Sequence, residues 1–172
     1  METKLAEDLA IPLSVYPHLP YWFTIRQAIL ELREAVIEMH EKRSLPREIL
    51  IFDEKYKLLG SARRRDLLRG LEPQFSSTEK TGKLFEVIMD PNLLEFSYDK
   101  LLENMHQSAE KPISEIMRPI KKTINHDDHI LKVIYEMVEN DLSLIPVMKE
   151  NKVIGVVRTV DIFDEISDML FD

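Results

Sequence analysis

The chain has 172 residues, of which 44% are hydrophobic and 31% charged, and its formal net charge is −8. This composition excludes a disordered chain, and the acidic balance argues against general binding to nucleic acid or to an anionic membrane. Cysteine is absent, which excludes disulfide bonds, thiolate metal sites and a cysteine nucleophile. No apolar run is long enough to span a bilayer, and the first residues do not resemble a secretory signal, so we expect a cytoplasmic protein.

The first elements form an extended segment and a helix. Two prolines keep residues 5–17 extended. Thr24 is a good N-cap for a helix, and apolar side chains recur at helical spacing as far as Met39. This spacing predicts a long first helix that ends in the polar run 41–47. A helix that is apolar over so much of its circumference needs partners on two sides, one of which we expect to be a second subunit.

A short strand, a turn and a second helix follow. The continuous apolar run 49–52 predicts a strand covered on both faces, and the polar residues 53–55 predict a turn, after which the chain pairs back. A short helix is expected after Asp66. Residues 73–111 are predicted to be an inserted connector that contains a helix capped by Ser97, because a loop of this length without structure would be unusual.

The second half repeats this order. A short strand is predicted at 123–124, an amphipathic helix from residue 130, a buried strand at 144–147 and a further strand at 153–157. The last strand runs through a short polar corner into a helix that Asp161 opens. Residues 1–72 and 112–172 are therefore predicted to be two copies of one unit with the order strand, helix, strand, strand, helix, and the first helix of the first copy is predicted to be longer by two to three turns.

The strand-to-helix corner has the same pattern in both copies, Gly-x-x-Arg-x-x-Asp. The residues are Gly60, Arg63 and Asp66 in the first copy and Gly155, Arg158 and Asp161 in the second. A glycine inside a strand marks a close approach of another backbone or of a ligand. A strand that enters a helix through a short corner brings free N–H groups and a carboxylate to one place, which suits a polar ligand.

These repeated units resemble the CBS domain, the cystathionine-β-synthase-type module. In the second unit the similar residues are Ile116-Met117-x-Pro119, the helix from His129, Leu144-Ile145-Pro146-Val147 and Gly155-Val156-Val157-x-x-x-Asp161. The first unit resembles the family more weakly, through Leu9-x-x-Pro12, Thr24-Ile25-x-x-Ala28-Ile29, Leu50-Ile51-Phe52 and Leu59-Gly60 with Asp66. Two such units in tandem form the pair called a Bateman module.

The resemblance implies an α/β (α+β) fold in which two pseudo-symmetric units pack sheet to sheet with two clefts between them. It also implies a regulatory module without catalysis of its own, which binds an adenosine ligand such as AMP, ADP or ATP and has no obligatory cofactor. In the family the corner aspartate accepts the ribose hydroxyls, a role that falls on Asp161 and Asp66. The family places adenine against apolar residues, which here are Ile124, Ile145 and Pro146.

The sequence departs from the family at both corners. Three residues after the glycine the family usually has Thr or Ser, whereas this chain has Arg63 and Arg158. Each arginine either clamps a ligand phosphate or folds away and pairs with an acid. Thr159 lies one position too late to replace the missing hydroxyl. Because the first unit also has Ile51 where the family has a proline, the better site is expected in the second unit.

Two other classes of function remain open. The departures, the long helix and the insertion fit a dimerisation or docking module for an effector protein that the sequence does not identify. A metal protein is the third reading, because His126 and His129 flank two acids. There is no P-loop, Gly-x-Gly-x-x-Gly or Gly-x-Ser-x-Gly motif, and the other histidines are scattered, so an enzyme is not expected.

Overall fold

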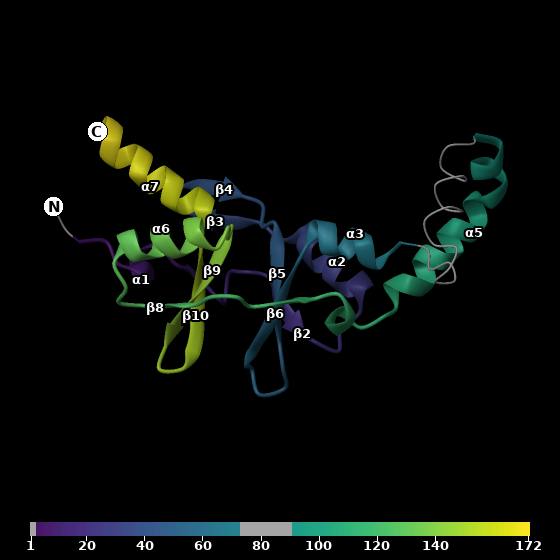
Figure 1. The fold of residues 1–172 in the computed structure, drawn as a ribbon, viewed down its shortest axis with the longest axis horizontal. Helices are drawn as coiled ribbons and strands as arrows, with labels where there is room; N and C mark the ends of the chain where they lie inside the picture. The colour runs from purple at the N-terminus through teal and green to yellow at the C-terminus, as the bar shows by residue number, and fades with distance from the viewer. Residues whose placement is uncertain (1–2, 73–90) are drawn as a thin grey trace.

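Two four-stranded sheets lie next to each other at the centre of the protein (Figure 1). The computed structural model describes residues 3–72 and 91–172. The first sheet has the strand order β2 (His18–Pro20), β5 (Glu48–Phe52), β6 (Leu58–Arg63) and β7 (Arg118–Pro119). The second has the order β1 (Ile11–Pro12), β10 (Lys152–Arg158), β9 (Leu144–Lys149) and β8 (Ile124–Asn125). The prediction of a mixed fold with two pseudo-symmetric sheets is confirmed.

Each sheet is covered by its own pair of helices (Figure 1). The pairs are α2 (Ile25–Glu34) with α3 (Arg64–Gly70), and α6 (Ile130–Glu139) with α7 (Thr159–Phe171). The shorter helices are α1 (Ala6–Leu9) and the 3₁₀ helix η1 (Ile113–Glu115), while α5 (Pro91–Ala109) lies at the far end of the molecule. Both halves thus contain the predicted order of strand, helix, strand, strand and helix. Among the described residues, no helix is long and apolar enough to cross a membrane.

A third core cluster joins the two sheets. It contains Leu50 and Phe52 of β5, Leu144 of β9 and Val156 of β10, together with Tyr16 from the segment between β1 and β2. These side chains are almost completely buried. The sheets therefore pack against each other, as predicted, and burial of this cluster removes apolar surface of both halves from water.

Each sheet takes one edge strand from the other half of the chain. β1 pairs with β10, where Pro12 lies opposite Gly155, and β7 pairs with β6, where Pro119 lies opposite Gly60. A Cβ atom at either glycine would overlap a backbone carbonyl oxygen, that of Ile11 or that of Arg118. The close approach predicted at these glycines is thus made by backbone. The division into residues 1–72, 73–111 and 112–172 stays a prediction. The edge strands β1 and β7 each pair with a strand on the other side of the connector.

The prediction of a long first helix is wrong. Helix α2 has 10 residues, as many as α6, and ends at Glu34. The following residues form a hairpin of β3 (Ile37–Met39) and β4 (Lys42–Ser44). His40 and Glu41 have φ values of 50° and 62°, the combination that a two-residue hairpin turn requires. The apolar residues 37 and 39 alternate as in a strand. Met39 also fits the helical spacing of the preceding residues, and for that reason the helix was predicted to be too long.

Helix α5 lies inside the predicted connector. It begins at Pro91 rather than at Ser97, which we expected to cap it. Residues 73–90, the rest of the connector before this helix, lie outside the described residues.

Candidate functional site

In the second unit, the corner between β10 and α7 is closed by an ion pair. Arg158 ends β10, and Asp161 lies in the first turn of α7. The Nε and Nη2 atoms of Arg158 donate to the two carboxylate oxygens of Asp161 at 2.7 and 2.6 Å, and its Nη1 donates to Ser44 Oγ at 3.0 Å. The side chains are only 11% and 24% exposed. This fork geometry uses both oxygens of the carboxylate.

The corner of the first unit is closed in the same way, with two further arginines, Arg118 and, at 3.9 Å, Arg69. Asp66 is 3% exposed and accepts from the backbone N–H of Arg63 at 3.0 Å and from its Nε at 3.2 Å. Arg118 of β7 donates from Nε to the other oxygen at 2.7 Å. Burial on its own would raise the pKa of Asp66, but the hydrogen bonds from Arg63 and Arg118 outweigh it and hold this pKa below its usual range.

In both corners the arginine at the family's hydroxyl position therefore holds the carboxylate that the resemblance assigns to ribose. The sequence left open whether these arginines clamp phosphate or pair with an acid, and the acid they pair with belongs to their own motif. Ligand binding by Asp66 and Asp161 stays a prediction, and it requires that the arginine first leave the carboxylate.

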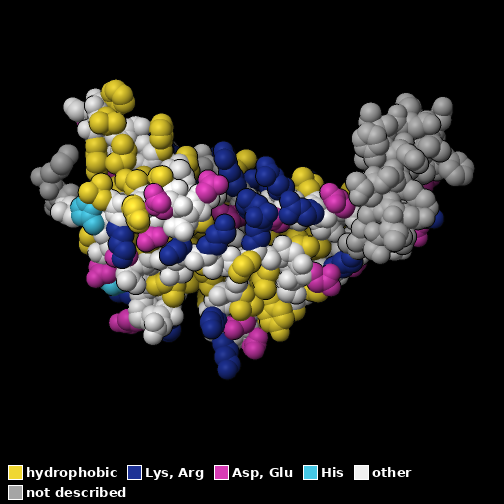
Figure 2. Space-filling model, viewed as in Figure 1, with side chains coloured by type: hydrophobic (Ala, Val, Ile, Leu, Met, Phe, Trp, Pro, Cys, Tyr) yellow, Lys and Arg dark blue, Asp and Glu magenta, His cyan; other side chains and the backbone are white. Residues whose placement is uncertain are grey.

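Two adjacent clefts lie where the sheets meet, and they share Glu48, Ser143 and Leu144. The larger, of about 850 Å³, is lined by Tyr16, Ser44, Leu45, Arg47, Glu48, Arg64, Ser143, Leu144, Arg158, Thr159, Val160 and Phe163. The smaller, of about 100 Å³, also has Ser61, Arg63, Arg118, Lys121, Lys122 and Pro146 in its wall. Figure 2 shows Lys and Arg side chains gathered in the middle of this face.

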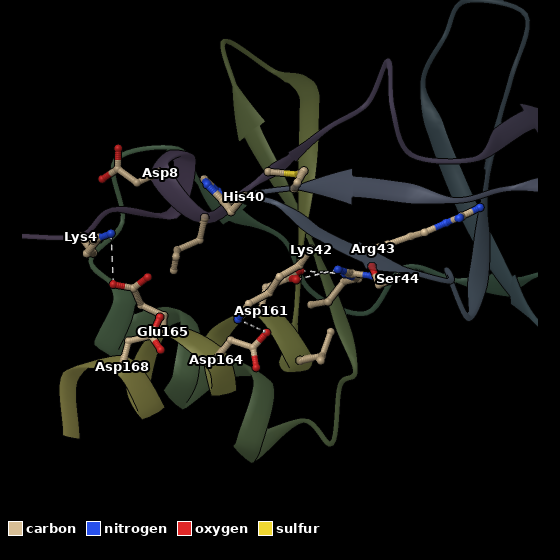
Figure 3. Close-up of a pocket in the computed structure, with 14 residues that line it drawn as sticks. Lys4, Asp8, His40, Lys42, Arg43, Ser44, Asp161, Asp164, Glu165 and Asp168 are labelled. Carbon is tan, nitrogen blue, oxygen red and sulfur yellow. Dashed lines mark hydrogen bonds and ion pairs between the residues drawn. The ribbon is translucent and has the colours of Figure 1, made fainter. Parts of the chain in front are cut away.

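A third cleft, of about 460 Å³, opens between the β3–β4 hairpin and α7 (Figure 3). It contains Asp161 and is crossed by two ion pairs, Lys42 Nζ with Asp164 Oδ2 at 3.2 Å and Lys4 Nζ with Glu165 Oε1 at 3.1 Å. Arg158 lines both this cleft and the larger one. The guanidinium thus lies at the boundary between a mainly cationic cleft and one of mixed charge.

The family of the second half follows from a comparison with known families. Residues 113–168 match the CBS domain. The second half of this chain is a CBS domain, and the whole chain has the fold of a CBS domain pair. No curated protein matches the sequence significantly.

Solved CBS pairs share this fold at low sequence identity. CBSX2 in complex with AMP superposes with a TM-score of 0.61 at 12% identity, covering 96% of this chain and 98% of that one. The CBS pair of MJ0100 with 5′-methylthioadenosine and S-adenosyl-L-methionine gives 0.62 at 18% identity, covering 98% and 99%. The cytosolic domain of the Mg²⁺ channel MgtE with ATP gives 0.59 at 20% identity, and the match covers 95% of this chain but 49% of that chain.

The other residues predicted for the site lie apart from one another. Thr159 lines the larger cleft, and its hydroxyl donates to the carbonyl oxygen of Leu142 at 3.1 Å. Pro146 lines the smaller cleft. Ile124 and Ile145 are buried in the core cluster of the second sheet. Contact of these two with adenine stays a prediction, and it would require the core to open.

Glu48 was not predicted as a site residue, yet it lines both clefts between the sheets. Glu48 is 8% exposed. Its Oε1 accepts from Ser143 Oγ at 3.4 Å, and its backbone oxygen accepts from the Tyr16 hydroxyl at 2.7 Å. Burial raises the pKa of the Glu48 carboxyl. Glu48 lies opposite Arg63 in the β5–β6 pair, as Leu144 lies opposite Arg158 in the second sheet. The sequence feature that could have pointed to Glu48 is its position as a charged residue directly before the buried run 49–52.

At the corner where the sequence suggested a metal site, the side chains of His126, Asp128 and His129 have hydrogen-bond or ion-pair partners within the protein. His129 accepts from the N–H of Leu131 at 3.1 Å, and His126 Nδ1 lies 3.2 Å from Glu7 Oε2. Asp128 accepts from the N–H of Asn125 at 2.8 Å and from Lys132 Nζ at 2.8 Å. No group of three or more His, Asp or Glu side chains in the described part of the chain is arranged to hold a metal ion.

Proposed function

We propose that this CBS pair is a regulatory module without catalysis of its own, and that it binds an adenosine nucleotide, AMP, ADP or ATP, in the larger cleft between its sheets. The observation that carries the proposal is the lining of this cleft. Arg47, Arg64 and Arg158 supply cations, while Leu144 and Phe163 supply apolar surface. Its volume of about 850 Å³ is within the range of small-molecule sites.

The chemistry of this lining matches the parts of a nucleotide. Guanidinium groups bind phosphate oxygens through paired hydrogen bonds, and apolar side chains cover the faces of a base. CBSX2, the MJ0100 pair and the MgtE domain were solved with adenosine ligands, which supports the same class here. A ligand held between two packed sheets shifts the population among their arrangements if it binds one arrangement more tightly. That shift is the regulatory signal we propose.

Nucleotide titration by calorimetry tests this function. ATP is expected to bind at least about tenfold more tightly than adenosine, because each charge-assisted hydrogen bond from an arginine to phosphate contributes about 1.5–3 kcal/mol. Adenosine is the matched control, since it keeps the base and the ribose and lacks the phosphates. If AMP, ADP and ATP all fail to give heat and to raise the unfolding temperature, the proposal is rejected.

One observation favours the alternative, a dimerisation or docking module whose nucleotide sites have decayed. Both corner carboxylates are already held by arginines. The same titration separates the two functions, because the alternative predicts no binding of any adenosine nucleotide. The effector protein and the cytoplasmic location both stay predictions from the sequence.

We also propose that the module forms a homodimer through α6 and α7. Large apolar side chains are exposed on both helices: Leu131, Tyr135 and Val138 on α6, and Phe163, Leu170 and Phe171 on α7. Figure 2 shows the apolar side chains of α7 gathered near the C-terminus. A patch of this kind on a soluble protein marks an interaction surface, and twofold dimers are the commonest self-assembly.

Tyr135→Glu is expected to convert the dimer to a monomer, because it places a charge in the middle of the α6 stripe. Light scattering coupled to size-exclusion chromatography at tens of micromolar measures the mass. Leu68→Glu on α3 is the control, since Leu68 is exposed to a similar extent on a different helix. A wild-type protein that elutes with the mass of a monomer would contradict the proposal.

A further inference from the structure

Glu48 lies at the junction of the two clefts between the sheets. It lines both of them, together with Ser143 and Leu144, so the clefts are adjacent along the seam between β5 and β9. Among the described residues that line the larger cleft, Glu48 is the only acid. A carboxyl group in this place faces whatever molecule fills the cleft.

The surroundings of Glu48 are strongly cationic. The positively charged residues that line the two clefts are Arg47, Arg64 and Arg158 in the larger and Arg63, Arg118, Lys121 and Lys122 in the smaller. Asp141 is the second acid among the described lining residues, and it is exposed. This charge attracts an anion, while the carboxyl of Glu48 repels phosphate locally. A bound anion must therefore present an uncharged hydrogen-bond donor to Glu48.

Glu48 differs from the two corner aspartates in its partners. Asp66 and Asp161 each accept from a guanidinium group at 2.7 Å, whereas the Glu48 carboxylate accepts from serine side chains, Ser61 and, at 3.4 Å, Ser143. Within residues 3–72 and 91–172, Glu48 takes part in no ion pair. Asp161, moreover, lines the cleft on the other side of Arg158. A ligand in the larger cleft thus reaches Glu48 without breaking an ion pair.

We propose that Glu48 accepts the ribose hydroxyls of a nucleotide bound in the larger cleft, with the phosphates directed to Arg47, Arg64 and Arg158. Two neighbouring hydroxyls that donate to one carboxylate form charge-assisted hydrogen bonds. The inference rests on the proposed nucleotide binding and assigns its orientation. Because the position equivalent to Glu48 in the second sheet is Leu144, the two described sheets offer this acceptor once, and one nucleotide is expected to bind there.

The test is calorimetry with ATP and with 2′,3′-dideoxy-ATP, which lacks both ribose hydroxyls. Wild type is expected to bind ATP at least about tenfold more tightly than the dideoxy analogue. Glu48→Gln is expected to weaken ATP binding by at least about tenfold and to remove the preference over the analogue. Asp141→Asn is the matched control, since it removes the same charge from the neighbouring wall and should leave ATP binding unchanged or slightly tighter.

The direction of the change in Glu48→Gln decides between two roles. If Glu48 only adds negative charge to a cationic cleft, its removal strengthens the binding of ATP, and equal or tighter binding overturns the inference. Loss of the ribose preference in Asp161→Asn but not in Glu48→Gln also overturns it and assigns the ribose to Asp161. If wild type binds no nucleotide at all, the proposed function fails and this inference fails with it.

Glu48→Gln keeps the shape of the side chain and its contact with Ser143, so the variant is expected to fold, which a thermal unfolding curve checks. Glu48→Asp is the second variant. It keeps the charge but shortens the reach, and it should lose the preference for ATP over the dideoxy analogue as well. Retention of the full preference in Glu48→Asp would count against the assignment.

Discussion

Replacing Gly155 with alanine is expected to destabilise the protein by about 3 kcal/mol, at the upper end of the cost of overpacking a core. The added Cβ would overlap the backbone carbonyl oxygen of Ile11. A backbone atom in a paired strand cannot turn aside as a side chain does, so β1 must move away from β10. Denaturation with urea measures the loss, and the m-value shows whether the unfolding remains cooperative.

The chain offers two matched comparisons for this variant. Gly60→Ala should be about as costly, because its Cβ would overlap the carbonyl oxygen of Arg118 in the equivalent strand pair. Gly70→Ala should be less costly than either, since the atoms nearest to its Cβ are side-chain methyl groups of Ile25 and Ile116, at 3.0–3.3 Å, which can shift more easily than backbone. If all three variants unfold at the same urea concentration, the pairing of β1 with β10 is contradicted.

Asp66→Ala is expected to destabilise the protein by about 2–4 kcal/mol, which lowers the unfolding temperature of a domain of this size by about 10 °C. The substitution removes the acceptor of three donors: the backbone N–H of Arg63, its guanidinium and that of Arg118. It also cuts the link between the start of α3 and the strand β7 from the other half. Asp127→Ala, which removes an exposed carboxylate, is the control and should leave the stability unchanged.

The loss caused by Asp66→Ala should depend on pH in a defined direction. The pKa of Asp66 lies below its usual range in the folded protein, because the hydrogen bonds from Arg63 and Arg118 outweigh the effect of burial. Its contribution to stability is therefore complete above the pKa of the unfolded chain and disappears as the pH falls through the folded pKa. The difference between wild type and variant should be constant near neutral pH and shrink below pH 4, when the two proteins are compared by urea denaturation. A difference that grows on acidification would contradict the assigned partners.

The local order of the elements could be predicted from the sequence because short-range signals determine it. The apolar run 49–52, the turn before residue 153 and the two Gly-x-x-Arg-x-x-Asp corners each lie within a few residues, and the structure has β5, the β9–β10 turn and two strand-to-helix corners there. The failure after Glu34 has a local cause too. The apolar residues 36 and 39 continue the helical spacing, whereas 37 and 39 alternate as in a strand, so the pattern alone does not distinguish the two. The positive φ values of His40 and Glu41 show that the chain forms a hairpin turn there.

The candidate site was less predictable because it depends on residues far apart in sequence. Arg118 lies 52 positions from Asp66, and Ser44 lies 114 positions from Arg158. These contacts exist only because the two sheets exchange edge strands and the β3–β4 hairpin lies beside α7. Glu48 was missed for the same reason. In the sequence it is a single glutamate before a strand. Only the fold brings it next to Ser143 of the other half, whose hydroxyl donates to its carboxylate.

The exchange of edge strands also limits how this protein can move. Because β1 joins the sheet of the second half and β7 joins that of the first, the halves are tied together at two separate places, at one edge of each sheet. A wide hinge opening would have to detach one strand from its sheet. Motion of the two halves inside one chain is thus expected to be limited to small sliding of the two sheets. Cutting the chain between the halves would leave each fragment with an unpaired sheet edge, so neither is expected to be an independent folding unit.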